Sequence, residues 1–334
     1  MTDTLNPGSV CVGRLVVDLP IGAKSTVNAT FNYMEVQPPK PAASFNAIKQ
    51  VLEDKTKILA GTKTERNEMG DRLARRAGFD PDKIFGTTQL VGSQIDGSVE
   101  QAIIGYLVKP NLPKTIAELH KFAGGYEYVF RSDGGGADTY PATRTRMWNA
   151  ALNFQPVNPG ELPVTPGFCV DGGMFSDPGS APLREGFTLV ASFKNHPDAN
   201  FVIDSSAIDS IDTNEPSLKH RVDSELGILR ANVEGRVSVL IRGEREAAGQ
   251  KGYQIGLSVP NDSIEGTTAY KFFWAADGVP NDASHPFMEV SLTIQPDEDK
   301  PASFENAKQA QAFWDELLQR IKIRPGAVGG SPTR

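Results

Sequence analysis

Cysteine and histidine are scarce in this chain of 334 residues, which has two cysteines and four histidines. The cysteines, Cys11 and Cys169, lie far apart, and neither belongs to a Cys-x-x-Cys pair. No two histidines have the i, i+4 spacing of a helical metal site; they are His120, His196, His220 and His285. Zinc sites and thioredoxin-like redox centres depend on such spacings. We therefore expect no metal and no cofactor.

Long apolar runs are also missing. No stretch reaches the roughly 18 to 20 apolar residues that cross a bilayer as a helix, so we expect no transmembrane segment. The N-terminus lacks the basic segment followed by an apolar one that marks a signal peptide. An export signal is therefore not visible in this sequence, which leaves the compartment open.

The known catalytic motifs are absent as well. The sequence contains no Gly-x-Ser-x-Gly, which exposes the nucleophile of an α/β-hydrolase on a strained turn. It contains neither the phosphate-binding loop nor a Gly-x-Gly-x-x-Gly that opens a helix. The glycine run at 134–136 precedes a polar loop, which favours a turn. The sequence therefore singles out no catalytic residue, although its 41 acidic residues leave catalytic carboxylates open.

The charge is acidic and unevenly distributed. The net charge of −7 argues against nucleic acid as a partner, because phosphate backbones are bound by clustered Lys and Arg. Residues 1–160 carry a net charge of +2, whereas residues 161–334 carry −9. The asymmetry indicates either a basic partner for the second half or a difference that serves solubility alone.

The densest acidic run lies in the second half of the chain. Its side chains are Asp204, Asp209, Asp212 and Glu215. Calcium loops place oxygen ligands at alternate positions around a glycine, and this run has neither the spacing nor the glycine. We interpret the run as a solvated loop or a protein-contact loop, and we select these four residues as partner-binding candidates.

Strand patterns outnumber helix patterns along the chain. Alternation and β-branched runs predict strands near 10–20, 25–36, 84–95, 102–109, 126–131, 167–170, 187–193, 201–203, 237–242, 253–259, 270–275 and 287–294. Apolar stripes predict helices over 45–59, part of 61–82, 141–154, 217–229 and 302–322. Ser44 stands where the first helix would be capped. Many strands with few helices indicate the α+β class.

The order of elements occurs twice. Each half reads strand, strand, helix, several strands and a closing helix with a tryptophan, and four prolines stiffen the segment between the halves. We therefore expect two similar domains, each an antiparallel sheet covered by helices. The predicted boundaries are 1–157 and 167–324, with a Pro-rich linker at 158–166 and a flexible tail at 325–334.

Two short motifs resemble a known family. Cys-Val-Gly-Arg-Leu-Val-Val-Asp-Leu-Pro at 11–20 resembles the opening of the immunity proteins paired with class-four phospholipase effectors of type VI secretion. Pro-Gly-Phe-Cys-Val-Asp-Gly-Gly at 166–173, followed by Gly-Phe-Thr-Leu at 186–189, resembles the start of that family's C-terminal domain. The resemblance spans both predicted domains.

The resemblance implies a periplasmic, non-enzymatic inhibitor. Its partner would be a cognate lipase effector, an α/β-hydrolase phospholipase, held by a clamp on its lid or cap so that lipid cannot reach the active site. The alternative is a periplasmic enzyme or a small-ligand-binding protein that uses a cleft between the domains.

The two cysteines gain an interpretation from the resemblance. Each lies in the first strand of its predicted domain, and the periplasm is oxidising. We therefore expect a Cys11–Cys169 disulfide that joins the two domains, which the chain-entropy model values at roughly 5 kcal/mol. The alternative is two buried free thiols that pack as small apolar side chains.

Overall fold

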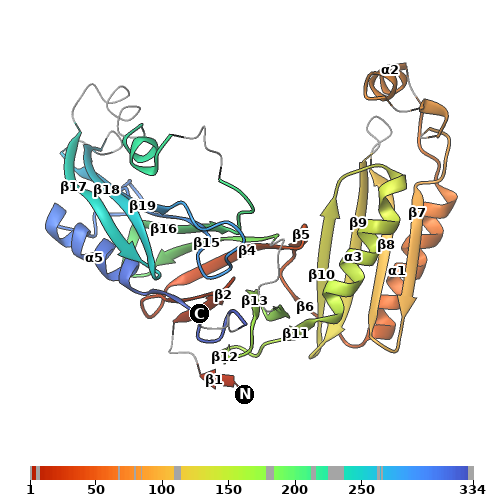
Figure 1. Cartoon of the computed structure of the whole chain (residues 1–334), viewed down its shortest axis with the longest axis horizontal. Coiled ribbons are helices and arrows are strands. Elements are labelled where there is room, and N and C mark those ends of the chain that lie inside the picture. The colour runs from red at the N-terminus through yellow and green to blue at the C-terminus, as the bar shows by residue number, and fades with distance from the viewer. Residues whose placement is uncertain are drawn as a thin grey trace. The chain divides into compact units, whose positions relative to one another are not determined.

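The computed structural model divides into two compact units (Figure 1). It describes residues 2–4, 8–66, 68–78, 80–83, 85–108, 114–177, 184–211, 216–224, 237–261, 264 and 266–329. Unit 1 consists of residues 1–29, 157–170 and 176–334, and unit 2 consists of residues 30–156 and 171–175. The residues before position 30 thus cluster with the second half of the chain, whereas the sequence predicted that they belong with the first half.

Unit 1 is built on a large sheet with the strand order β17-β18-β19-β20-β16-β15-β4. The bounds are β4 Lys24–Phe31, most of which belongs to this unit, β15 Glu185–Phe193, β16 His196–Ser206, β17 Ser238–Ala247, β18 Gln250–Pro260, β19 Thr268–Ala276 and β20 Phe287–Ile294. Along this order, every pair of neighbouring strands between β17 and β15 is antiparallel. The clean alternation of the sequence along β20 reflects one buried face.

Helices cover both faces of this sheet. Helix α5 (Ala307–Gln319) is capped by Asn306 and packs the buried Trp314 against Phe272. The helical residues 218–224 place Val222 in a second apolar cluster, against which Phe273 packs. Because Phe272 and Phe273 are neighbours on one strand, they point to opposite faces. The α5 side and the 218–224 side are therefore different faces of the sheet.

Small strands near the chain ends complete unit 1. The sheet β2-β3-β21 joins Ser9–Val12, Leu15–Asp18 and Ile321–Ile323, and β1 (Thr2–Thr4) pairs with β12 (Glu161–Pro163). The expected single strand at 10–20 is a hairpin, because Gly13 turns the chain with φ of 56°. A Cβ at this glycine would lie 2.6 Å from the Phe187 ring. β13 (Gly167–Val170) contacts this hairpin through an antiparallel bridge between Cys169 and Gly13.

Unit 2 contains a sheet with the strand order β5-β10-β9-β8-β7, and β6 also pairs with β10. The bounds are β5 Met34–Val36, β6 Lys40–Pro41, β7 Leu90–Asp96, β8 Gln101–Val108, β9 Lys114–Ala123 and β10 Tyr126–Asp133. The remaining elements are α1 Phe45–Gly61, α2 Glu68–Arg76, α3 Tyr140–Leu152, the 3₁₀ turns Pro81–Lys83 and Ala137–Thr139, β11 Phe154–Pro156 and β14 Gly173–Ser176.

Helices α1 and α3 both pack on β8 and β9. Ala102 and Ile104 contact the α1 side, whereas Gly105 lies against the Tyr140 ring of α3. Successive residues of β8 thus face different helices, which explains why nearly the whole strand is buried. Unit 2 is a sheet covered on both faces.

The structure confirms the α+β class and most predicted elements. Ser44 accepts a hydrogen bond from the Ala47 N–H and caps α1 as expected. The stripe predicted for this helix is only partly buried: Phe45, Ile48 and Leu52 are buried, whereas Val51 and Ile58 are exposed.

Two other expectations need correction, one strand was missed, and one predicted helix is described only in part. The extended stretch 25–36 is broken into β4 and β5 by Asn32 and Tyr33, which have positive φ. Strand β9 was not predicted. The closing helix ends at Gln319, and its last apolar residue, Ile321, begins β21 instead. The helix predicted over 217–229 is observed at 218–224, and 225–229 lie outside the described residues.

The predicted linker and tail carry more structure than expected. Residues 161–163 form β12 within the linker. Ala327 in the predicted tail is buried, and its carbonyl accepts hydrogen bonds from the Gly167 N–H and from Arg14. The chain therefore stays ordered through Ala327, and 330–334 lie outside the described residues.

Candidate partner-binding surface

Two of the four acidic partner-binding candidates, Asp204 and Asp209, lie among the residues that the structure describes. Asp204 lies in β16, half-buried, and its Oδ1 accepts a hydrogen bond from the Thr188 hydroxyl at 2.5 Å. It stands opposite Glu289 of β20. Asp212 and Glu215 lie outside the described residues. The structure therefore places Asp204 on a sheet face and not in the expected loop.

Asp209 does lie in an exposed loop. Its carboxylate pairs with the guanidinium of Arg184 at 2.7 Å. The hydrogen bond and the positive charge of Arg184 hold the pKa of Asp209 below its ordinary value. The carboxylate is thus ionised at neutral pH, but its charge is partly balanced by its neighbour.

A second loop is bonded to the Asp209 loop. The Asn281 N–H donates to the carbonyl of Ile208 at 2.8 Å, and its side-chain amide donates to the carbonyl of Asp209 at 3.2 Å. We call residues 207–211 and 277–286 together the loop pair. The loop at 277–286 was not predicted as functional, although its Asp-Gly-Val-Pro-Asn-Asp sequence is typical of a turn.

Two aspartates of the loop pair have an arginine neighbour: Asp209 pairs with Arg184, and Asp277 pairs with Arg221. The third, Asp282, contacts the Nδ1 of His285 at 2.8 Å. These pairings make the surface less negative than the acidic composition suggests. The surface is also partly apolar, since Ile211 is 55% and Val279 is 47% exposed.

A hollow opens beside the loop pair. Its walls are formed mainly by Leu15, Phe168, Phe187, Ala207, Ala283 and Pro286. Arg14 and Glu185 also line it, and the guanidinium of Arg14 holds that carboxylate at 2.7 and 2.8 Å. Both side chains are buried, and burial raises the pKa of Glu185 despite the opposing effect of Arg14. The hollow thus has an apolar wall and a charge pair that satisfies itself.

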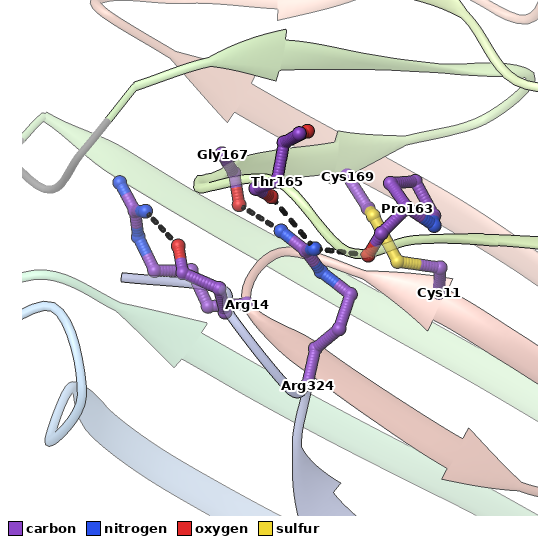
Figure 2. The surroundings of a disulfide bond; sticks show 8 residues. Cys11, Arg14, Pro163, Thr165, Gly167, Cys169 and Arg324 are labelled. Atoms are coloured by element: carbon purple, nitrogen blue, oxygen red, sulfur yellow. Dashed lines mark hydrogen bonds between the residues drawn. A yellow bond between two sulfur atoms is a disulfide. The ribbon is translucent and has the colours of Figure 1, made fainter. Parts of the chain in front are cut away.

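The wall of the hollow is anchored by the disulfide Cys11–Cys169, which Figure 2 shows beside Arg14 and Arg324. Main-chain hydrogen bonds between Gly13 and Cys169, at 2.7 and 2.8 Å, flank the bond. The structure thus contains the expected disulfide, and the alternative of two free thiols is wrong. Both cysteines belong to unit 1, so the bond links two segments of one unit and does not join units 1 and 2.

Arg324 fixes the C-terminal segment to the same place. It is 1% exposed and donates to the carbonyls of Pro163, Thr165 and Gly167 (Figure 2). Burial, together with the charge of Arg14, lowers its pKa to about 10. Sequence reasoning did not predict this contact, because Arg324 is 157 or more positions from its partners.

Unit 2 contains a polar cluster that the sequence did not reveal. Glu118 of β9 accepts hydrogen bonds from Lys55 of α1 and from the Tyr106 hydroxyl, each at 2.5 Å. His120 lies on the same face and contacts Glu127 at 2.7 Å. Burial raises the pKa of Glu118, but the hydrogen bonds and the charge of Lys55 outweigh it and give a net lowering. Lys55 and Tyr106 both bond to Glu118, which is typical of a contact that holds α1 on the sheet.

Neither a metal site nor a membrane-spanning helix is found in the described part of the chain. Those residues contain no group of three or more His, Cys, Asp or Glu that can hold a metal ion. None of the helices among them is long and apolar enough to cross a bilayer.

The comparisons with known proteins give a family for the second half of the chain and a fold for nearly all of it. Residues 161–326 match the family model described as Tle cognate immunity protein 4 C-terminal domain. The apo structure of the immunity protein TplEi of the type VI secretion system of Pseudomonas aeruginosa is 18% identical, with a TM-score of 0.75 over 95% of this chain and 97% of that chain. The crystal structure of the Tle4–Tli4 complex gives the same values.

These solved structures establish the fold alone, because their sequences are only 18% identical to this one. No curated protein sequence matches the chain. The family model covers the segment that carries Cys169, the acidic candidates, the loop pair and Arg324. Residues 161–326 are therefore the C-terminal domain of a Tle cognate immunity protein, and the chain has the fold of the solved immunity proteins.

Proposed function

We propose that this protein binds its cognate Tle phospholipase in the periplasm and inhibits it without any chemistry of its own. The observation that carries the proposal is the match of residues 161–326 to the immunity domain. The shared fold with the Tli4 complex along 95% of the chain supports it. The disulfide suits an oxidising compartment such as the periplasm.

Inhibition by holding a lid needs no contact with the catalytic nucleophile. A lipase must open its apolar site to a bilayer, usually by moving a lid or cap. A protein that prefers the closed state shifts the equilibrium by its difference in affinity for the two states. A shift from mostly open to mostly closed takes on the order of 5 kcal/mol. We propose that the chain clamps the lid in this way.

The loop pair and the neighbouring acidic residues form the proposed contact surface. They combine exposed apolar side chains with partly balanced carboxylates. Interface centres are apolar and their rims polar, so this composition suits a protein partner. TplEi itself has been solved in complex with a peptide called "L" (18% identity, TM-score 0.71, covering 97% of this chain and all of that chain). In that relative, therefore, a peptide is bound by the same fold.

A phospholipase assay tests the proposal. The purified cognate Tle effector is mixed with phospholipid vesicles, and fatty-acid release is followed with and without the protein. We expect release to fall towards background when the protein reaches the effector concentration. The protein alone should release nothing. Undiminished effector activity at a severalfold excess of the protein refutes the proposed function.

A further inference from the structure

The turn between the neighbouring strands β4 and β5 contains an unusual residue. Its two central residues, Asn32 and Tyr33, both have positive φ, at 50° and 61°. Two-residue hairpin turns of this kind favour Asn, Asp or Gly, because a Cβ is strained in the left-handed region. Asn32 fits this preference. Tyr33 does not, so its side chain is present at a cost to the free energy of folding.

Two other hairpins of the described chain show what such a turn ordinarily contains. The β9–β10 turn consists of Gly124 and Gly125, and the β17–β18 turn consists of Ala248 and Gly249. All four residues have positive φ, and the second position is glycine in both turns. Glycine adopts this conformation without a steric penalty. The backbone of the β4–β5 turn therefore does not explain its tyrosine.

Packing in the core does not explain Tyr33 either. This residue is 56% exposed. Its ring contacts the guanidinium of Arg146 from α3, and the Cζ atom lies 5.0 Å from the ring centroid. A cation–π contact at an exposed site stabilises a fold only modestly, but it restrains the ring. Unit 2 thus presents a restrained aromatic side chain at its surface.

Arg146 itself lacks an anionic partner. It is half-buried, and its Nη2 donates to the Ser132 hydroxyl at 3.0 Å. Its Nε is buried without an acceptor, and no carboxylate of the described residues pairs with it. Burial lowers the pKa of Arg146. A buried charge is unfavourable unless it is paired, so this second residue also reduces the stability of the fold.

We infer that Tyr33 and Arg146 together bind the cognate Tle effector: the ring packs on an apolar group of the effector, and the guanidinium meets one of its carboxylates. The inference rests on the proposed function and adds a contact on unit 2. Strained residues persist where they serve a function, and tyrosine and arginine dominate binding energies at protein interfaces. A bilayer is disfavoured, because membrane attachment takes a larger apolar face or a cluster of cations.

Tyr33→Gly separates binding from stability. Glycine removes the ring and relieves the strained φ, so the melting temperature should not fall. Binding of the effector should weaken about tenfold or more. Tyr126→Gly is the matched control and should leave the affinity unchanged, because Tyr126 is also exposed and also lies beside a hairpin turn of unit 2. Biolayer interferometry with the purified effector measures binding, and thermal unfolding gives the melting temperature.

Arg146→Gln tests the charged half of the contact. It should weaken binding about tenfold at low salt and less at high salt, because salt screens an ion pair. Arg144→Gln makes the same change two residues earlier on α3, on another side of the helix, and should leave the affinity unchanged.

Full affinity in both the Tyr33→Gly and the Arg146→Gln protein overturns the inference, as does an equal loss in the two controls. A lower melting temperature of Tyr33→Gly with unchanged affinity also overturns it, because the ring then serves the fold. Binding to phosphatidylglycerol vesicles that Tyr33→Gly abolishes, with unchanged affinity for the effector, assigns the pair to a membrane and overturns it too. Failure of the unmodified protein to bind the effector refutes the proposed function instead.

Discussion

At the scale of single residues, the candidate surface differs from an acidic patch. Asp209 is paired with Arg184, and Asp277 is paired with Arg221. The net charge of the second half suggested bare carboxylates, yet composition does not show which cations lie beside them. We expect the carboxylates still to orient a basic partner, because a paired charge in a negative region keeps part of its field.

Reversing the charge at Asp209 tests this steering role. Asp209→Lys places a cation beside Arg184, so we expect association with the effector to slow about two- to tenfold at low salt and to depend less on salt. Asp299→Lys makes the same charge change at an exposed site elsewhere on unit 1 and is the control. Association rates are measured by stopped flow. Equal rates for Asp209→Lys and the unmodified protein place the contact elsewhere.

The second prediction at this scale concerns Glu118. Its pKa is lowered in the folded protein, so it stabilises the fold above the unfolded-state pKa of about 4.5, and this contribution is lost as the pH falls through the folded-state value. Glu118→Gln should lower the free energy of unfolding at pH 7 by about 1–2 kcal/mol, because bonds to a charged acceptor become bonds to a neutral one. The difference from the unmodified protein should shrink at pH 3.5.

Urea unfolding at the two pH values measures the effect of Glu118→Gln. Glu53→Gln is the matched control on α1, where the carboxylate pairs with Lys49 at the surface. Such a surface pair contributes about 0–1 kcal/mol. A loss for Glu118→Gln that is the same at pH 7 and pH 3.5 contradicts the pKa argument.

At the scale of elements, the alternation of apolar and polar residues predicted the strands that bury one face. The strands of the β15–β16 hairpin and β20 were predicted because one face of each is buried. Strand β9 was missed because Glu118 and His120 occupy the face turned to α1, where the pattern calls for apolar residues. Turns at Gly13 and at Asn32 and Tyr33 were missed because a positive φ leaves little trace in hydropathy.

The packing of α3 on β8 gives a prediction at this scale. A Cβ at Gly105 would lie 2.1 Å from the ring of the buried Tyr140. The ring is fixed by its hydroxyl bond to the Gly92 carbonyl at 3.1 Å, so α3 must shift to admit a methyl group. Gly105→Ala should destabilise unit 2 by about 1–3 kcal/mol.

The control for Gly105→Ala is Gly97→Ala. No atom lies within 4 Å of a Cβ at Gly97, and its φ is ordinary, so little change is expected there. Thermal unfolding followed by circular dichroism compares the two variants. Equal melting temperatures for Gly105→Ala and Gly97→Ala contradict the close packing of α3.

At the scale of the whole molecule, the chain ends meet in unit 1. The disulfide and Arg324 hold segments near residues 11, 167 and 324 together. The resemblance to the immunity proteins indicated the cysteine pairing, but no local signal marks Arg324 or the hollow, because their partners lie far along the chain. Sites assembled from distant segments are visible only once the fold is known.

Removing the disulfide tests its contribution to unit 1. The sequence separation of 158 residues gives a stabilisation of about 5 kcal/mol in the chain-entropy model. Cys11→Ala with Cys169→Ala should therefore lower the urea midpoint of unit 1, reported by the fluorescence of the buried Trp274 and Trp314. Reductant should lower the midpoint of the unmodified protein similarly and leave the variant unchanged. A midpoint that responds to neither change contradicts the stabilising role.

We propose that this molecule acts by binding another folded protein, and calorimetric titration of the purified effector with the purified protein measures that binding. We expect saturable binding with a Kd near 1 nM, about −12 kcal/mol, which implies an interface of at least about 1,600 Å². The absence of binding at micromolar concentrations, with both proteins folded, contradicts this mode of action.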